Sequence, residues 1–119
     1  MLKKNVKILN KRFQNPVTCL TAYSASVAKL IDGMVDIILI GDSVGTTLYG
    51  MKNTQMVTLD MMQAHGVAVV KNINESISVI DMPYKTYTTN KLAYKNASLL
   101  LKKTKAKILK IEVTKKNLS

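Results

Sequence analysis

The sequence predicts an α/β fold built on a parallel sheet, and three observations support this prediction. Four short runs rich in apolar and β-branched residues are typical of strands, and they are Val17–Ala22, Val35–Gly41, Ile77–Met82 and Lys107–Val113. Stretches with helical spacing of apolar residues separate these runs, and strands that alternate with helices pair in parallel through right-handed crossovers. The second run is nearly continuous Ile, Leu and Val, which is typical of a strand covered on both faces.

Three helices are predicted between the strands, each with its own capping residue. The first begins after Ser24, a good N-cap, and ends before Gly33. The second has Thr58 as its cap, and Gly66 weakens it a little. The third begins near Thr89, and lysines crowd its last turn, where the helix dipole favours cations. A short N-terminal helix is expected before the first strand, and a glycine-containing loop is expected after the second.

Composition and length favour one domain that spans residues 1–119, since no linker or internal repeat interrupts the chain. The chain is 47% hydrophobic and 21% charged, which excludes a disordered composition. Its apolar runs are too short to span a bilayer, and we expect neither a membrane partner nor a secretory signal. The single cysteine, Cys19, cannot form an internal disulfide, which is typical of a reducing cytoplasm.

The net charge of +11 suggests nucleic-acid binding as one hypothesis. Other features argue against it, because Arg12 is the only arginine and recognition of bases and phosphates usually favours arginine forks. The chain has no Trp, and its five tyrosines are not interleaved with basic residues. We therefore expect non-specific polyanion binding at low salt and no specific nucleic-acid partner.

Acidic residues lie at the carboxyl ends of three of the predicted strands, although the chain has only seven acidic residues in all. Asp42 follows the second strand, Asp81 ends the third and Glu112 ends the fourth. Because the carboxyl ends of parallel strands meet at one edge, these carboxylates converge, and their repulsion favours a bound cation. Oxygen ligands without His or Cys favour a hard divalent ion, most plausibly Mg²⁺.

Simpler interpretations of the same residues stay open. Asp42 and Asp81 are both placed to act as turn residues, and Glu112 is placed to pair with a lysine on the surface. Lys110 lies two residues before Glu112, so both face the same side of a strand. There Lys110 either holds a substrate carboxylate as a point charge or is simply solvated. A packed or surface role is expected for His65 rather than a catalytic one, and no phosphate-binding glycine motif is present.

Five motifs in order along the chain resemble those of the ketopantoate hydroxymethyltransferase (3-methyl-2-oxobutanoate hydroxymethyltransferase) family. They are "TCLTAYSASVAKLID", "VDIILIGDSVG", "MVTLDMMQAH", "VIDMPY" and "ILKIE". The resemblance implies a parallel (β/α) barrel of TIM type, of which this chain would carry about four βα units. It also implies a site at the carboxyl face of that barrel.

The resemblance also implies a set of site residues and a reaction. The implied metal ligands are Asp42, Asp81 and, through water, Glu112, and the implied keto-acid contacts are Asp42, Ser43, Asp81 and Lys110. The reaction transfers a hydroxymethyl group from 5,10-methylenetetrahydrofolate to 3-methyl-2-oxobutanoate and gives 2-dehydropantoate, towards pantothenate. Mg²⁺ would acidify the C3 proton of the keto acid and stabilise the enolate.

The chain departs from the family pattern in ways that affect the expected activity. The general base of the family is a glutamate on a later strand, which lies beyond the end of this chain, so no catalytic residue is expected here. The glycine pair usual after the last glutamate is replaced by Val113 and Thr114. We therefore expect a truncated enzyme that is weakly active or inactive alone, and that forms a homo-oligomer or needs a C-terminal half. The alternative is a non-catalytic remnant or assembly module that needs a partner chain.

Overall fold

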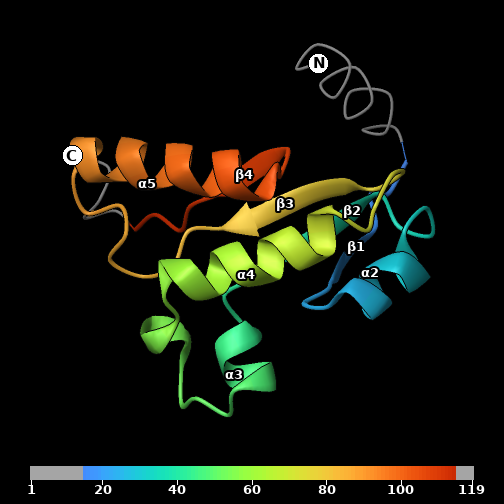
Figure 1. The fold of residues 1–119 in the computed structure, drawn as a ribbon, viewed down its shortest axis with the longest axis horizontal. Coiled ribbons are helices and arrows are strands. Elements are labelled where there is room, and N and C mark those ends of the chain that lie inside the picture. Colours follow the sequence, from blue (N-terminus) through green and yellow to red (C-terminus); the bar gives the residue numbers. More distant parts are fainter. Residues whose placement is uncertain (1–14, 115–119) are drawn as a thin grey trace.

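Four parallel strands form one sheet at the centre of the computed structural model, which describes residues 15–114 (Figure 1). In sheet order, which is also chain order, they are β1 (Cys19–Thr21), β2 (Ile37–Ile40), β3 (Ile77–Asp81) and β4 (Ile108–Lys110). Each strand lies inside one of the four predicted runs, and every neighbouring pair is parallel, so the parallel α/β prediction is confirmed. Across residues 15–114 the sheet is open, with β1 and β4 at its edges.

The three predicted helices are present, and each begins at the predicted cap. They are α2 (Ala25–Ile31), α4 (Leu59–Val70) and α5 (Asn90–Thr104). The hydroxyl oxygens of Ser24, Thr58 and Thr89 each accept a hydrogen bond from a backbone N–H in the first turn. Figure 1 shows α4 crossing one face of the sheet against β2 and β3, and packing beside α5. The helix expected near the N-terminus lies outside the described residues.

The segment after β2 contains two short helices where the sequence predicts only a loop. They are α3 (Val44–Leu48) and the 3-10 turn η1 (Thr54–Met56). Local sequence does not favour α3, which has no side-chain cap and contains two threonines. Tertiary packing holds it instead, since a Cβ on Gly45 would lie 2.5 Å from a methyl carbon of Val57. Glycine is needed there for this close approach.

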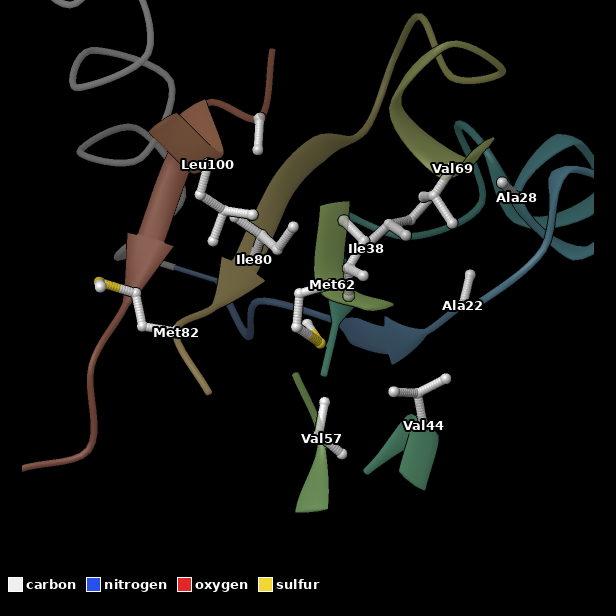
Figure 2. Close-up of a cluster of buried hydrophobic side chains, with 12 residues drawn as sticks. Ala22, Ala28, Ile38, Val44, Val57, Met62, Val69, Ile80, Met82 and Leu100 are labelled. Atoms are coloured by element: carbon white, nitrogen blue, oxygen red, sulfur yellow. The ribbon is translucent and has the colours of Figure 1, made fainter. Parts of the chain in front are cut away.

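The core lies between the sheet and the helices that cover it. Figure 2 shows Ile38 and Ile80 from the sheet beside Met62 from α4 and Leu100 from α5. All four side chains are fully buried. The packing of α4 depends on Gly66, because a Cβ at that position would lie 2.6 Å from atoms of both Ile80 and Thr104.

The prediction that the second strand is covered on both faces is wrong in part. Ile38 and Ile40 are fully buried, but Ile37 and Leu39 on the other face are only half-buried. Their neighbours in register on β1 are the short side chains Cys19 and Thr21, which are themselves exposed and give little cover. Full burial is found instead in β3, which has a paired strand on each side.

No helix in the part of the chain that the structure describes is long and apolar enough to cross a membrane. The parallel arrangement has a direct consequence for the site. All four strands end at the same edge of the sheet, and the predicted site residues lie at the last position of β3 and β4 or just after β2 and β4.

Candidate active site at the carboxyl edge of the sheet

An ion pair between neighbouring strands forms the centre of the site. Asp81 and Lys110 are partners in the register of β3 and β4, so their side chains project from the same face. The Lys110 Nζ lies 2.8 Å from Asp81 Oδ1, and only 6% of the Asp81 side chain is exposed. Burying a carboxylate costs free energy unless an opposite charge pairs with it, and Lys110 supplies that charge.

The second oxygen of Asp81 joins the site to β2. Asp81 Oδ2 accepts a hydrogen bond of 3.1 Å from the backbone N–H of Asp42. The carboxylate of Asp81 therefore bridges the ends of three adjacent strands, since Lys110 lies on β4 and Asp42 follows β2. This bridge fixes the relative positions of three of the predicted site residues.

Glu112 pairs with Lys110 at the outer side of the site. Its Oε1 lies 3.1 Å from the Lys110 Nζ, while 72% of the Glu112 side chain is exposed. Burial alone would lower the pKa of Lys110, but its hydrogen bonds to Asp81 and Glu112 outweigh burial and raise the pKa above its ordinary value. Lys110 is therefore a fixed cation at the edge of the sheet rather than a fully solvated one, and the predicted pairing of Glu112 with a lysine is confirmed.

The electrostatic environment of Asp42 indicates a cluster of like charges. Burial raises the pKa of Asp42 above its ordinary value, and the negative charges of Asp81 and Glu112 raise it further. A hydrogen bond from the Thr54 side chain and the charge of Lys110 act in the opposite direction. The charges of Asp81 and Glu112 therefore act on Asp42, which agrees with acidic residues gathered at one edge of the sheet, while their convergence on one point stays a prediction.

The donor chemistry of this cluster fits a hard divalent cation, because carboxylate oxygens are the ligands that Mg²⁺ prefers. Among residues 15–114, however, no three His, Cys, Asp or Glu side chains are arranged so that they could hold one ion together. The ammonium of Lys110 lies between Asp81 and Glu112 and separates their carboxylates. The metal triad of Asp42, Asp81 and Glu112 stays a prediction.

Ser43 directs its hydroxyl away from the helix that it precedes. Its side chain makes no capping bond to α3, and its Oγ lies 2.6 Å from the hydroxyl of Tyr23. Space for this hydroxyl depends on Gly41, because a Cβ there would lie 2.9 Å from Ser43 Oγ. The hydroxyl lies next to Asp42, at the same edge of the sheet as the ion pair.

Three residues at this edge are missed by the sequence-based interpretation, namely Tyr23, Thr54 and Tyr87. The Tyr87 hydroxyl donates a 3.2 Å hydrogen bond to the backbone carbonyl of Glu112. Burial raises the pKa of Tyr87, and the charges of Glu112 and Asp42 add to that rise. All three residues lie in segments that connect the strands and helices, or in the short turn η1. Only the fold brings them to the site, and no local spacing indicates it.

His65 is half-buried on α4, and both of its ring nitrogens have partners. Its Nδ1 lies 2.7 Å from the backbone carbonyl oxygen of Tyr23, and its Nε2 lies 3.0 Å from the hydroxyl of Tyr49. These contacts agree with the packed or surface role expected for His65.

Comparison with known proteins gives a consistent assignment. The family model described as ketopantoate hydroxymethyltransferase matches residues 3–119. A 3-methyl-2-oxobutanoate hydroxymethyltransferase of Anaplasma marginale is 48% identical over 112 residues, which cover 94% of this chain and 40% of that protein. The protein of the same name from Pelagibacter ubique is 40% identical over 116 residues, covering 98% of this chain and 45% of the relative.

A third relative, 3-methyl-2-oxobutanoate hydroxymethyltransferase 1 of Burkholderia lata, is 51% identical over 94 residues, or 78% of this chain and 33% of that protein. The chain thus spans less than half the length of the relatives that it matches. The match nevertheless includes every strand and helix described above, together with the edge that holds Asp42, Asp81 and Lys110. The chain belongs to the ketopantoate hydroxymethyltransferase family.

Proposed function

We propose that the chain contributes the keto-acid and metal-binding part of a 3-methyl-2-oxobutanoate hydroxymethyltransferase. The reaction would transfer a hydroxymethyl group from 5,10-methylenetetrahydrofolate to 3-methyl-2-oxobutanoate and give 2-dehydropantoate. The observation that carries this proposal is the bridge from Lys110 through Asp81 to the Asp42 backbone, at the carboxyl edge of a sheet in a chain of this family. A cytoplasmic location is part of the proposal, since the substrates are small metabolites.

Lys110 is the residue that we assign to the substrate carboxylate. An ammonium has three donors, and Asp81 and Glu112 accept two of them. The third remains for an oxygen of the keto acid, and the raised pKa keeps the ammonium charged at neutral pH. Ser43 would donate its hydroxyl proton to a second oxygen of the same substrate, from the adjoining strand end.

Asp42 and Asp81 would hold Mg²⁺ directly, and the exposed Glu112 would reach it through water. When bound, the ion would polarise the 2-oxo group and favour loss of the proton from C3 of the keto acid. The carboxylate of Asp81 keeps its hydrogen bond from the Asp42 backbone and so orients the two aspartates relative to each other. No residue of this chain is assigned as the general base or to the folate co-substrate.

We propose that the open sheet is completed by other protein, either a homo-oligomeric partner or a C-terminal half. Large apolar side chains are exposed along or beside both edge strands, including Leu20 on β1 and Ile111 and Val113 after β4. Within the described part of the chain, β1 and β4 each have one edge without a neighbouring strand, and such an edge can accept a further strand. The same observation supports the second candidate function, a non-catalytic assembly module that binds a partner chain.

The keto-acid proposal is tested by titrating the purified chain with 3-methyl-2-oxobutanoate in the presence of MgCl₂ and following binding by calorimetry or NMR. We expect weak binding that Asp81→Asn abolishes. Asp60→Asn is the matched control, because it neutralises an exposed aspartate in the first turn of α4 and should leave binding unchanged. A folded wild-type chain that does not bind the keto acid would contradict the proposal.

Turnover separates the two candidate functions. The chain is assayed with 5,10-methylenetetrahydrofolate and 3-methyl-2-oxobutanoate, alone and after mixing with the C-terminal part of a longer relative. Activity that appears only in the mixture supports the enzyme part, whereas a stable inactive complex supports the assembly module.

A further inference from the structure

The hydroxyl of Ser43 is held by a side chain from a neighbouring strand end. Tyr23 follows β1 and Ser43 follows β2, and the parallel pairing of these strands brings the two segments together. The two hydroxyl oxygens are 2.6 Å apart, at the short end of the range for O–H···O hydrogen bonds. A serine side chain has three staggered rotamers, and this hydrogen bond selects one of them for Ser43.

The backbone of Tyr23 is held in turn by α4. A carbonyl oxygen only accepts, so the proton of His65 lies on Nδ1, which donates to the Tyr23 carbonyl over 2.7 Å. In the neutral ring, Nε2 then accepts from the Tyr49 hydroxyl over 3.0 Å. The Tyr49 and His65 rings also meet edge to face, with centroids 5.8 Å apart. The half-buried His65 therefore connects a packed helix to the position of Tyr23.

We propose that Tyr23 is a positioning residue that orients the Ser43 hydroxyl towards the keto acid, and that His65 fixes Tyr23 for this role. The inference rests on the proposed function, because it requires the keto acid to contact Ser43. Either hydroxyl can donate, and we assign the donation to the phenol because it is the more acidic of the two. The proton of Ser43 is then available to a substrate oxygen, and the bond from Tyr23 strengthens that donation by polarising the serine hydroxyl.

The test is a double-mutant cycle on the affinity for 3-methyl-2-oxobutanoate, measured in MgCl₂ with the full chain. We expect Tyr23→Phe to weaken binding about tenfold, as loss of one hydrogen bond in a binding site typically does, and Ser43→Ala to weaken it similarly. In the Ser43→Ala background, Tyr23→Phe should change affinity less than about twofold, because its effect passes through the serine. Tyr94→Phe, at a residue 79% exposed on α5, is the matched control and should bind like the wild type.

His65 gives a second, independent arm of the test. His65→Ala removes the donor to the Tyr23 carbonyl and should weaken binding, whereas His65→Asn, whose amide can donate from the same region, should restore part of it. Thermal midpoints of all variants show whether the fold is intact. A rescue by asparagine at equal thermal stability is not expected from a purely structural role.

The outcomes separate the positioning role from the proposed function. Equal affinity of wild type and Tyr23→Phe overturns the positioning role alone, and so does an effect of Tyr23→Phe that persists in full without the Ser43 hydroxyl. Failure of the wild type itself to bind the keto acid contradicts the proposed function, and the positioning role falls with it.

Discussion

The Asp81 carboxylate and the Lys110 ammonium lie 2.8 Å apart across two neighbouring parallel strands, and the carboxylate is almost completely buried. This relationship predicts that Lys110 contributes more to the stability of the fold than an exposed lysine does. Lys110→Met should destabilise the chain by about 1–2 kcal/mol, since it leaves the buried Asp81 carboxylate without its cationic partner, although the partial exposure of Lys110 moderates the loss. Urea unfolding at neutral pH measures the change. Lys95→Met, which removes an exposed lysine on α5, should be nearly neutral, and equal losses in the two variants would contradict the prediction.

Divalent ions should stabilise the chain through the carboxylate cluster. We expect Mg²⁺ to raise the thermal midpoint and a chelator to reverse the rise, because an ion that binds only the native state stabilises it. Asp42→Asn should abolish the effect, since it removes the carboxylate whose pKa is raised by burial and by its acidic neighbours. In the control variant Asp60→Asn, Mg²⁺ should still raise the thermal midpoint. A thermal midpoint that does not respond to Mg²⁺ at any concentration would argue against the metal site.

Asp32 lies at the opposite edge of the sheet, and its hydrogen bonds predict that the stability of the fold depends on pH. Burial alone would raise the pKa of Asp32, but hydrogen bonds from the backbone of Ser76, Asn74 and Glu75 lower it below its ordinary value. A lowered folded-state pKa contributes stability that is present above the unfolded pKa of 3.8 and is lost as the pH falls through the folded pKa.

Asp32→Ala should therefore cost about 1–2 kcal/mol at neutral pH, as loss of a carboxylate that accepts backbone hydrogen bonds typically does. The difference from wild type should shrink as the pH falls from 3.8 through the lowered folded-state pKa, because the carboxylate of the folded wild type becomes protonated there. Urea unfolding at several pH values measures both quantities. Glu75→Ala removes an exposed carboxylate from the segment whose backbone binds Asp32, and it serves as the control. A difference that stays constant in acid would show that the charge of Asp32 is not involved.

Gly66 should not tolerate alanine, although alanine is the better helix former. The added methyl group would lie 2.6 Å from side-chain atoms of Ile80 and Thr104, and overpacking of this kind costs about 1–3 kcal/mol. Thr104→Ser removes one of the crowded methyl groups. The double variant should therefore be more stable than the sum of the single changes predicts, as chemical denaturation would show. Strict additivity would indicate that the contact relaxes at no cost.

The exposed edge of β1 should promote association between chains. Leu20 is 50% exposed on this edge strand, and Leu20→Lys should shift sedimentation profiles towards the monomer at a given concentration. Leu30→Lys is the control, because Leu30 is 71% exposed but belongs to the helix α2 and not to the edge strand. If both substitutions act equally, general surface hydrophobicity rather than the edge drives association.

The strands and long helices can be predicted because their signals are local. Hydrophobic runs identify the strands, and Ser24, Thr58 and Thr89 identify the helix starts through bonds to residues only three positions away. The short helix α3 cannot be predicted in this way, since it depends on the contact of Gly45 with a residue beyond its own end.

Some residues of the candidate site can likewise be predicted from the sequence, and others cannot. Asp42, Asp81 and Lys110 can be predicted because strand ends in a parallel sheet share one edge. Tyr23 and Tyr87 cannot, because their side chains reach the site from connecting segments whose path only the folded chain determines. The unequal burial of the two faces of β2 cannot be predicted from the sequence either, since it depends on which strand lies beside β2.

The order of the strands in the sheet has a consequence for how the chain folds during synthesis. Because sheet order equals chain order, each strand pairs with the one made immediately before it, and a single connection separates each pair. Pairings of short sequence separation form faster than distant ones. The sheet can therefore grow from the ribosome one strand at a time, with β1 and β2 already paired before β4 has emerged. The growing edge stays open to the next strand at every stage.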